Sequence, residues 1–266
     1  MLKHYPSIAA LRQDYLTLVR KQDGVATDWY GNESAQDTVH LAHSGNTALV
    51  PEAEAVLAKL NTEIATPRRA WERAPAGAFC SVPDVLAGLP TPMRRLAHTY
   101  DERAPITILA TTTSSAGVPA AVLRKRGAVI LALVLALSRT RPVSLRQLAT
   151  LDGRDKDGET IITAEINTTP LDVATACYVL TSAGFARRMT YDLATALNGF
   201  SGGWPRGYTY GKNTRFFTAL VPRLGLNPEH TLLVASAEVG DTMLSNPVAW
   251  VNAQIARFAQ IQEDAE

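Results

Sequence analysis

The distribution of hydrophobic residues changes at Pro105, and beyond it short β-branched runs alternate with longer apolar stretches. Residues 106–111 form a short β-branched run typical of a strand, and Pro119 is a favoured first-turn residue for the long helix predicted after it. Residues 143–149 alternate with a period of two, and a turn-forming segment joins them to a second β-rich run at 159–166, which predicts a hairpin. The remaining predicted elements are a strand at 230–235 and helices at 171–182, 186–197, 213–224 and 247–262.

This order of elements predicts an α/β fold, in which a mainly parallel sheet is flanked by helices and ligand contacts lie at the carboxyl ends of the strands. The N-terminal third differs, because Ile8, Leu11 and Tyr15 fall at helical spacing, residues 53–60 repeat that pattern, and prolines punctuate residues 67–92. We therefore expect an N-terminal helical and loop-rich extension over residues 1–104 and an α/β domain over residues 105–266.

Composition is that of an ordinary globular chain, with 266 residues of which 46% are hydrophobic. The longest apolar run, residues 128–137, is about half of the roughly 20 residues that span a bilayer, so it predicts a buried helix and no membrane partner. The N-terminus lacks the apolar core of a signal peptide. Cys80 and Cys177 stand in apolar surroundings and are expected to be buried free thiols in a reducing cytoplasm, that of the host cell if the protein is phage-encoded.

Charge is segregated although the formal net charge is only +1, because no Asp or Glu occurs from Arg103 to Leu151 or from Leu193 to Pro228. Within the second acid-free segment, residues 200–212 interleave aromatic rings with cations on a glycine-rich backbone. Cations attract a phosphate chain, while aromatic faces stack on bases of any sequence, so this mixture favours single-stranded nucleic acid. The predicted nucleic-acid-binding residues are Trp204, Arg206, Tyr208, Tyr210, Lys212, Arg215, Arg124, Lys125 and Arg126.

Alternatives remain for several of these residues. The rings of Trp204, Tyr208 and Tyr210 flank glycine and proline, and they suit stacking on bases as well as packing in a core. Short basic clusters such as Arg187-Arg188 are typical of solvated helix faces or salt bridges, although together they could line a groove. We interpret residues 114–117 first as a helix cap and second as an anion-binding site. They lack the sequence patterns of a phosphate-binding loop and of a nucleophile elbow.

The succession of a strand ending in hydroxyls, a helix, a hairpin with an antiparallel second strand and a later apolar strand resembles the von Willebrand factor A domain over residues 105–258. That family holds a metal ion with an Asp-x-Ser-x-Ser loop, a Thr after the hairpin and a later Asp. Thr113 and Ser115 match the two serine hydroxyls of that loop, and Thr168 or Thr169 matches the threonine. Both carboxylates are missing, because Thr111 stands in place of the first Asp and Ala235-Ser236 stands in place of the second. Because Mg²⁺ requires hard, preferably anionic oxygens, we expect no metal and no other cofactor, although Asp241 could approach from a loop.

Residues 77–93 and 126–133 also resemble uncharacterised proteins of bacteriophages and mobile elements, a resemblance that implies an origin but no activity. The leading hypothesis is a non-enzymatic, phage-type protein that binds nucleic acid, with single-stranded DNA favoured, and that acts beside a phage or host replication or transcription protein. The alternative is a protein-interaction module of von Willebrand A type with a degenerate metal site, holding a partner such as a ring ATPase. An enzyme ranks last, because no catalytic constellation is evident in the sequence.

Overall fold

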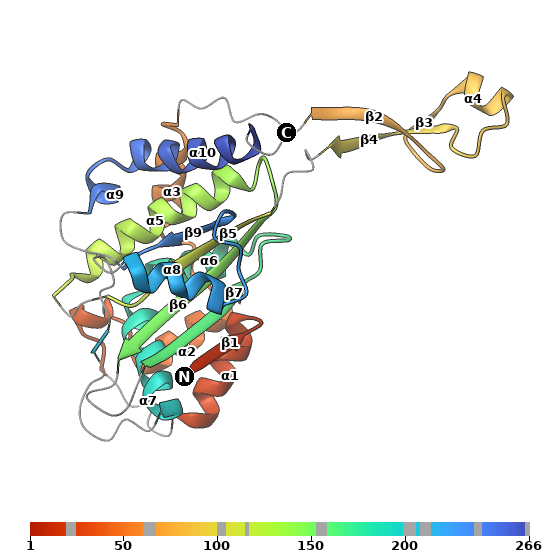
Figure 1. The fold of residues 1–266 in the computed structure, drawn as a ribbon. Helices are drawn as coiled ribbons and strands as arrows, with labels where there is room; N and C mark the ends of the chain where they lie inside the picture. The colour runs from red at the N-terminus through yellow and green to blue at the C-terminus, as the bar shows by residue number, and fades with distance from the viewer. Residues whose placement is uncertain are drawn as a thin grey trace.

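A sheet of five strands in the order β1-β7-β6-β5-β9 forms the centre of the described structure, and β8 adds to β6 (Figure 1). The computed structural model describes residues 1–19, 25–60, 68–99, 105–114, 117–152, 159–198, 206–207, 214–236 and 241–263. The strands are β1 (Leu2–Tyr5), β5 (Ile106–Thr111), β6 (Val143–Asp152), β7 (Glu159–Ile166), β8 (Arg206–Gly207) and β9 (Thr231–Val234). The strands predicted at 106–111, 143–149, 159–166 and 230–235 are therefore confirmed.

Pairing in the sheet is mostly parallel. β5 runs parallel to both β6 and β9, and β1 runs parallel to β7. β6 and β7 pair antiparallel from Leu145↔Ile166 to Asp152↔Glu159, which confirms the predicted hairpin. As a result the carboxyl ends of β5, β6 and β9 lie at one edge of the sheet, where β7 begins. We call this edge the carboxyl edge.

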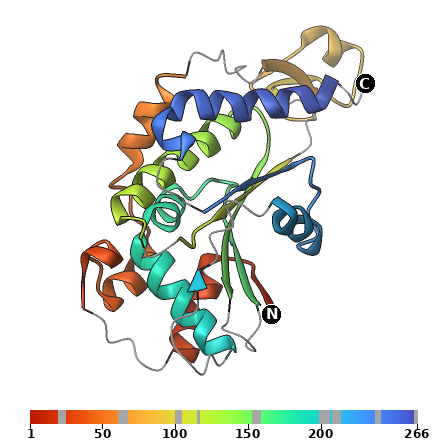
Figure 2. The same ribbon diagram turned by 60° about the vertical axis from the view of Figure 1, so that its left-hand side comes forward.

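Most of the described helices cover one face of the sheet, while α8 lies on the other face (Figure 2). The helices on the crowded face enclose the main core, in which Ile108, Leu131 and Phe185 are inaccessible to solvent. A smaller core joins Leu220 of α8 to Leu109, Leu148 and Ile161 of the strands. The longer helices are α1 (Ile8–Leu18), α2 (Ala35–Ser44), α3 (Val50–Leu57), α5 (Ala120–Leu137), α6 (Val173–Thr181), α7 (Thr190–Asn198), α8 (Thr214–Arg223) and α10 (Pro247–Glu263).

Helix α5 crosses the centre of the crowded face, and residues 126–134 are buried on every side. It begins after Pro119 as predicted, and Pro119 itself is the N-cap residue, without a side-chain cap hydrogen bond. Of the predicted cap at 114–117, Ser115 and Ala116 lie outside the described residues. Gly127 allows α5 to approach the Leu180 carbonyl of α6 more closely than any side chain would permit. Among the described helices, none combines the length and apolar character needed to cross a bilayer.

The uneven helix cover explains the polar residues of the sheet. In the first half of β6 burial alternates, with Leu145 buried and Arg146 half-buried, whereas residues 147–151 are buried on both sides. On the more exposed face His4 of β1 lies 2.9 Å from the Thr163 hydroxyl, and Arg146 pairs with Glu165 at 2.8 Å. An antiparallel hairpin tolerates such a half-solvated face, so these polar side chains are consistent with their position.

The N-terminal segment is part of the same core, in contrast to the expected extension over residues 1–104. β1 belongs to the central sheet, and Tyr5, Leu11 and Tyr15 are buried against β7 and α7 in the main core. The part that stands apart is an arm over residues 68–99, which projects from the body in Figure 1. It consists of the antiparallel strands β2 (Arg68–Ala74), β3 (Phe79–Cys80) and β4 (Met93–Thr99), which the sequence did not predict, and the short helix α4 (Val82–Leu86).

The two cysteines differ in their surroundings. Cys177 is a buried free thiol as predicted, and burial raises its pKa. Cys80 is also free but exposed, so the prediction of burial is wrong there. Cys80 lies in the short strand β3 of the arm, where no core covers it.

Candidate functional site

Strand β8 lies directly beyond the end of β5, beside the last residues of β6. β5 pairs with β6 up to Thr111↔Leu148, and β8 pairs with β6 at Leu151↔Gly207 and Asp152↔Arg206. The other side of β6 is occupied by β7 as far as Asp152, so β8 must lie on the side of β5. Arg206 of the second acid-free segment is therefore at the carboxyl edge, next to the loop from which α5 of the first segment begins.

The loop that leaves β5 is polar and buried. Thr111, Thr112, Thr113 and Ser114 are each at most 5% exposed. The Thr112 hydroxyl donates to the Gln147 side-chain oxygen at 3.1 Å, and the Thr150 amide contacts the Thr113 hydroxyl at 3.5 Å. In the part of the chain that the structure describes, the buried hydroxyls of Thr111 and Thr150 have no hydrogen-bond partner. Buried polar atoms normally have partners, so hydroxyls without one are candidates for binding a polar ligand or water.

Arg126 lies beneath this edge and not on the surface. Its guanidinium donates to the Thr111 carbonyl and the Val234 carbonyl at 3.0 Å each, and to the Ala235 carbonyl. The side chain is 3% exposed, and burial lowers its pKa to about 10, an effect opposed by the charge of Asp241. Arg126 therefore joins the ends of β5 and β9, and the prediction that it contacts phosphate at the surface does not fit its position.

Arg187 and Arg188 are buried as well, in contrast to the solvated face that their sequence suggested. They belong to the π-helical turn η2 (Phe185–Met189), and their guanidiniums lie 5.0 Å and 4.0 Å from the ring centres of Trp29 and Tyr30 respectively. Arg187 also donates to the Trp29 carbonyl at 2.7 Å and approaches the Ser114 hydroxyl at 3.4 Å. This arginine thus connects the N-terminal segment to the loop after β5.

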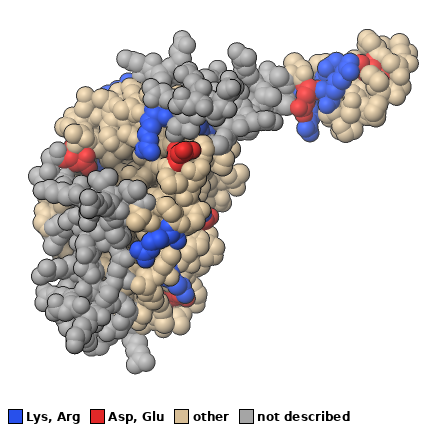
Figure 3. Space-filling model, in the orientation of Figure 1, with Lys and Arg blue, Asp and Glu red and all other residues tan. Residues whose placement is uncertain are grey.

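The three consecutive cations of α5 point in different directions. Lys125 is exposed, and Arg124 is exposed but donates to the Gly31 carbonyl at 3.0 Å. For Arg206 and Arg215 the structure describes the backbone alone, in β8 and in the first turn of α8. The remaining predicted contacts lie outside the described residues, namely Trp204, Tyr208, Tyr210 and Lys212. On the face shown in Figure 3 the described basic and acidic side chains are interspersed.

Two carboxylates near these cations are partly buried. Glu33 accepts from the Ser182 hydroxyl at 2.8 Å and the Tyr178 hydroxyl at 2.9 Å, and burial raises its pKa although these bonds oppose the rise. Burial raises the pKa of Asp192 to about 6, while the Tyr15 hydroxyl and the Arg188 charge act in the opposite direction. Both carboxylates therefore bind a proton more readily than exposed ones.

The residues that resemble a von Willebrand A metal site are not brought together. Thr113 lies at the carboxyl edge, and Ser115 is outside the described residues. Because β7 is antiparallel, Thr168 follows the opposite end of the sheet, near the start of β6, so it cannot share a site with Thr113. Asp241 is the N-cap of α9 (Thr242–Ser245), where it accepts from the Met243 amide at 3.0 Å. The described residues contain no cluster of three His, Cys, Asp or Glu side chains suited to a metal.

Residues 1–237 match the family described as Domain of unknown function (DUF7192), and the chain belongs to that family. The matched range includes β1, the arm and β9, and it spans the boundary expected at residue 104. No curated protein and no solved structure matches the chain.

Proposed function

We propose that the carboxyl edge binds single-stranded nucleic acid without catalysing a reaction. The observation that carries this proposal is the register of β8, which places Arg206 beside the loop leading into α5. Two segments that are free of acidic residues in the sequence thereby meet at one edge of the sheet, although Asp152 stands opposite Arg206 and Glu159 stands opposite Asp152 at the same edge. The carboxyl ends of parallel strands are also where α/β proteins commonly bind ligands.

The electrostatics of the edge support this proposal. The guanidiniums of Arg126 and Arg187 are buried close to the loop after β5 and add fixed positive charge beneath it. Lys125 is exposed in the second turn of α5, close enough to the start of the helix to contact a phosphate bound at the carboxyl edge. Phosphate contacts of this kind supply affinity that does not depend on base sequence. The unpartnered hydroxyls of Thr111 and Thr150 could bind polar groups of a nucleotide or an ordered water.

The salt dependence of binding tests the proposal. A variant that combines Arg124→Gln, Lys125→Gln and Arg206→Gln should bind a labelled single-stranded oligonucleotide more weakly. The slope of log affinity against log salt should flatten by about 2, because each lost phosphate contact on a single strand contributes about 0.7. An unchanged slope in a folded variant would exclude this edge as the binding surface.

The second candidate is the protein-interaction module of von Willebrand A type. It is favoured by the chain order of β5, α5, the β6–β7 hairpin and β9, and by the exposed apolar side chains of the arm. It is opposed by Thr168, which lies at the wrong end of the sheet. A phage origin, and a replication or transcription protein as partner, stay proposals that rest on the sequence resemblance. Co-purification of the chain with a protein partner such as a ring ATPase would favour the interaction module.

A further inference from the structure

The arm exposes large apolar side chains in a part of the chain remote from the carboxyl edge. Figure 3 shows its end as a projection covered mostly by uncharged residues. Leu86 is 83% exposed, and most of the large apolar side chains that the structure exposes are in this arm. The group, which we call the arm tip, comprises Trp71, Phe79, Val82, Val85, Leu86 and Leu89. Contiguous exposed apolar side chains mark interaction sites more often than isolated ones.

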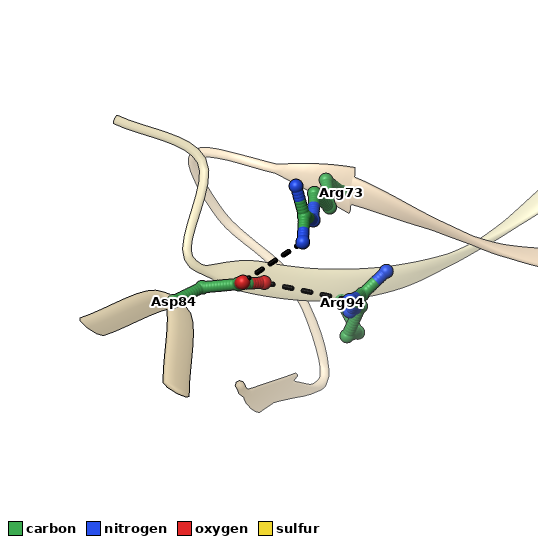
Figure 4. A network of polar contacts seen from close by, with 3 residues as sticks. All are labelled: Arg73, Asp84 and Arg94. Carbon is green, nitrogen blue, oxygen red and sulfur yellow. Dashed lines mark hydrogen bonds and ion pairs between the residues drawn. The ribbon is translucent and has the colours of Figure 1, made fainter. Parts of the chain in front are cut away.

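Helix α4 is oriented with its charged residue inward and its apolar residues outward. Asp84 is 5% exposed, and its two carboxylate oxygens contact Arg73 of β2 at 2.9 Å and Arg94 of β4 at 3.4 Å (Figure 4). Val85 and Leu86, by contrast, point away from the strands into solvent. An isolated folding unit would bury the leucine and expose the aspartate. The ion pairs therefore fix α4 in an orientation that only a partner can stabilise by burial.

The charge of the arm distinguishes between possible partners. Residues 68–99 contain five arginines and two acidic residues. Asp84 is buried by its two arginines, and Glu72 is paired with Arg95, so the arm presents apolar and cationic groups to a partner. Contact between two arm tips would bring like charges together, which argues against a second copy. The rings of Trp71 and Phe79 pack on each other, with their centres 4.7 Å apart, and the side chains that α4 exposes are aliphatic and cannot stack on bases, which argues against nucleic acid.

We propose that the arm tip docks into an apolar groove bordered by carboxylates on a different protein. The apolar side chains supply the burial, and the surplus positive charge of Arg73 and Arg94, which share the single carboxylate of Asp84, attracts the acidic border. This inference does not depend on nucleic-acid binding at the carboxyl edge, because it involves a separate surface.

A library of random peptides displayed on phage provides the probe. Peptides are selected on the wild-type chain after counter-selection on a Val85→Ser/Leu86→Ser variant, and the enriched sequences are synthesised with a fluorescent label. We expect peptides that combine large apolar residues with Asp or Glu. They should bind the double variant at least tenfold more weakly than wild type and should lose affinity as salt is raised.

Val25→Ser is the matched control, because Val25 is also 83% exposed but lies outside the arm. It should leave peptide affinity unchanged, and both variants should keep the wild-type melting temperature. Three results would overturn the proposal. The selection could yield no peptides whose binding depends on Val85 and Leu86. Alternatively, wild type could form a dimer, or could sediment with phosphatidylserine vesicles, in a way that the double variant abolishes. Oligonucleotide affinity should be equal in all these variants, so a failure here is distinguishable from a failure at the carboxyl edge.

Discussion

Replacing Arg126 by Met should destabilise the fold, because the guanidinium holds the ends of two parallel strands. Arg126 donates to the carbonyls of Thr111, Val234 and Ala235 from within the core. Methionine is unbranched and has no donor, so the substitution removes these hydrogen bonds, and because methionine is shorter than arginine it also leaves the guanidinium position unfilled. The carbonyl oxygens would then remain buried without this donor.

The magnitude follows from two opposing contributions. A pKa lowered to about 10 by burial corresponds to a cost of about 3 kcal/mol for keeping the guanidinium charged in the interior. Hydrogen bonds from a charged donor contribute about 1.5 to 3 kcal/mol each, so three of them contribute about 4.5 to 9 kcal/mol. The hydrogen bonds outweigh the cost of burial. We expect Arg126→Met to lower the free energy of unfolding by about 3 kcal/mol.

Urea unfolding followed by circular dichroism measures this change. With a slope of about 3 kcal/mol per molar urea, the midpoint of Arg126→Met should fall by about 1 M. Lys125→Met is the matched control, because the neighbouring Lys125 is exposed, and its midpoint should stay within about 0.2 M of wild type. Equal midpoints for wild type and Arg126→Met would refute the structural role of Arg126.

Three further predictions concern other parts of the molecule. Burial raises the pKa of Asp192 to about 6, so the folded chain retains a proton that the unfolded chain releases near pH 4. As pH rises from about 4 to 6.5, the free energy of unfolding of wild type should therefore fall by on the order of 3 kcal/mol relative to Asp192→Asn. Equal pH dependence of the two free energies, measured by urea unfolding, would contradict this. Gly127→Ala should lower the melting temperature, because the clash of the new methyl group with the Leu180 carbonyl costs about 1 to 3 kcal/mol and outweighs a gain of about 1 kcal/mol in helix propensity. A raised melting temperature would show that α5 and α6 can separate. Asp84→Asn should release Arg73 and Arg94, so trypsin should cut the arm several-fold faster than in wild type. The melting temperature of the body should stay constant. An unchanged rate of cleavage would show that the ion pairs do not hold α4 in place.

The central strands were predictable because burial left a clear pattern in the sequence. The run at 106–111 is rich in β-branched residues and is almost entirely buried, and the alternation in the first half of 143–149 corresponds to a half-solvated face of the hairpin. Strand β1 has four residues, Leu-Lys-His-Tyr, and its parallel pairing with β7 depends on a partner more than 150 residues away. In the arm, β2 and β4 carry adjacent arginines and lie near prolines, so local sequence favoured a loop over a strand.

The candidate site was predictable only in part. Helical periodicity contains the information that Arg126 is buried, because it stands three residues after Leu123 and four before Ile130, which are both buried. Helical periodicity did not indicate the burial of Arg187 and Arg188, because both lie in a π-helical turn, which interrupts the period of 3.6 residues. Convergence of β8 with the loop after β5 depends on strand register, which the sequence of a two-residue strand does not specify.

The most direct test of the proposed function is a fluorescence-anisotropy titration with single- and double-stranded oligonucleotides of the same length. The wild-type chain should bind the single strand more tightly at low salt, and a Trp204→Ala/Tyr208→Ala/Tyr210→Ala variant should lose about 1 to 3 kcal/mol of that affinity for each stacked base while retaining its melting temperature. No binding by the wild-type chain at low salt, or equal affinity for a folded triple variant, would contradict the account.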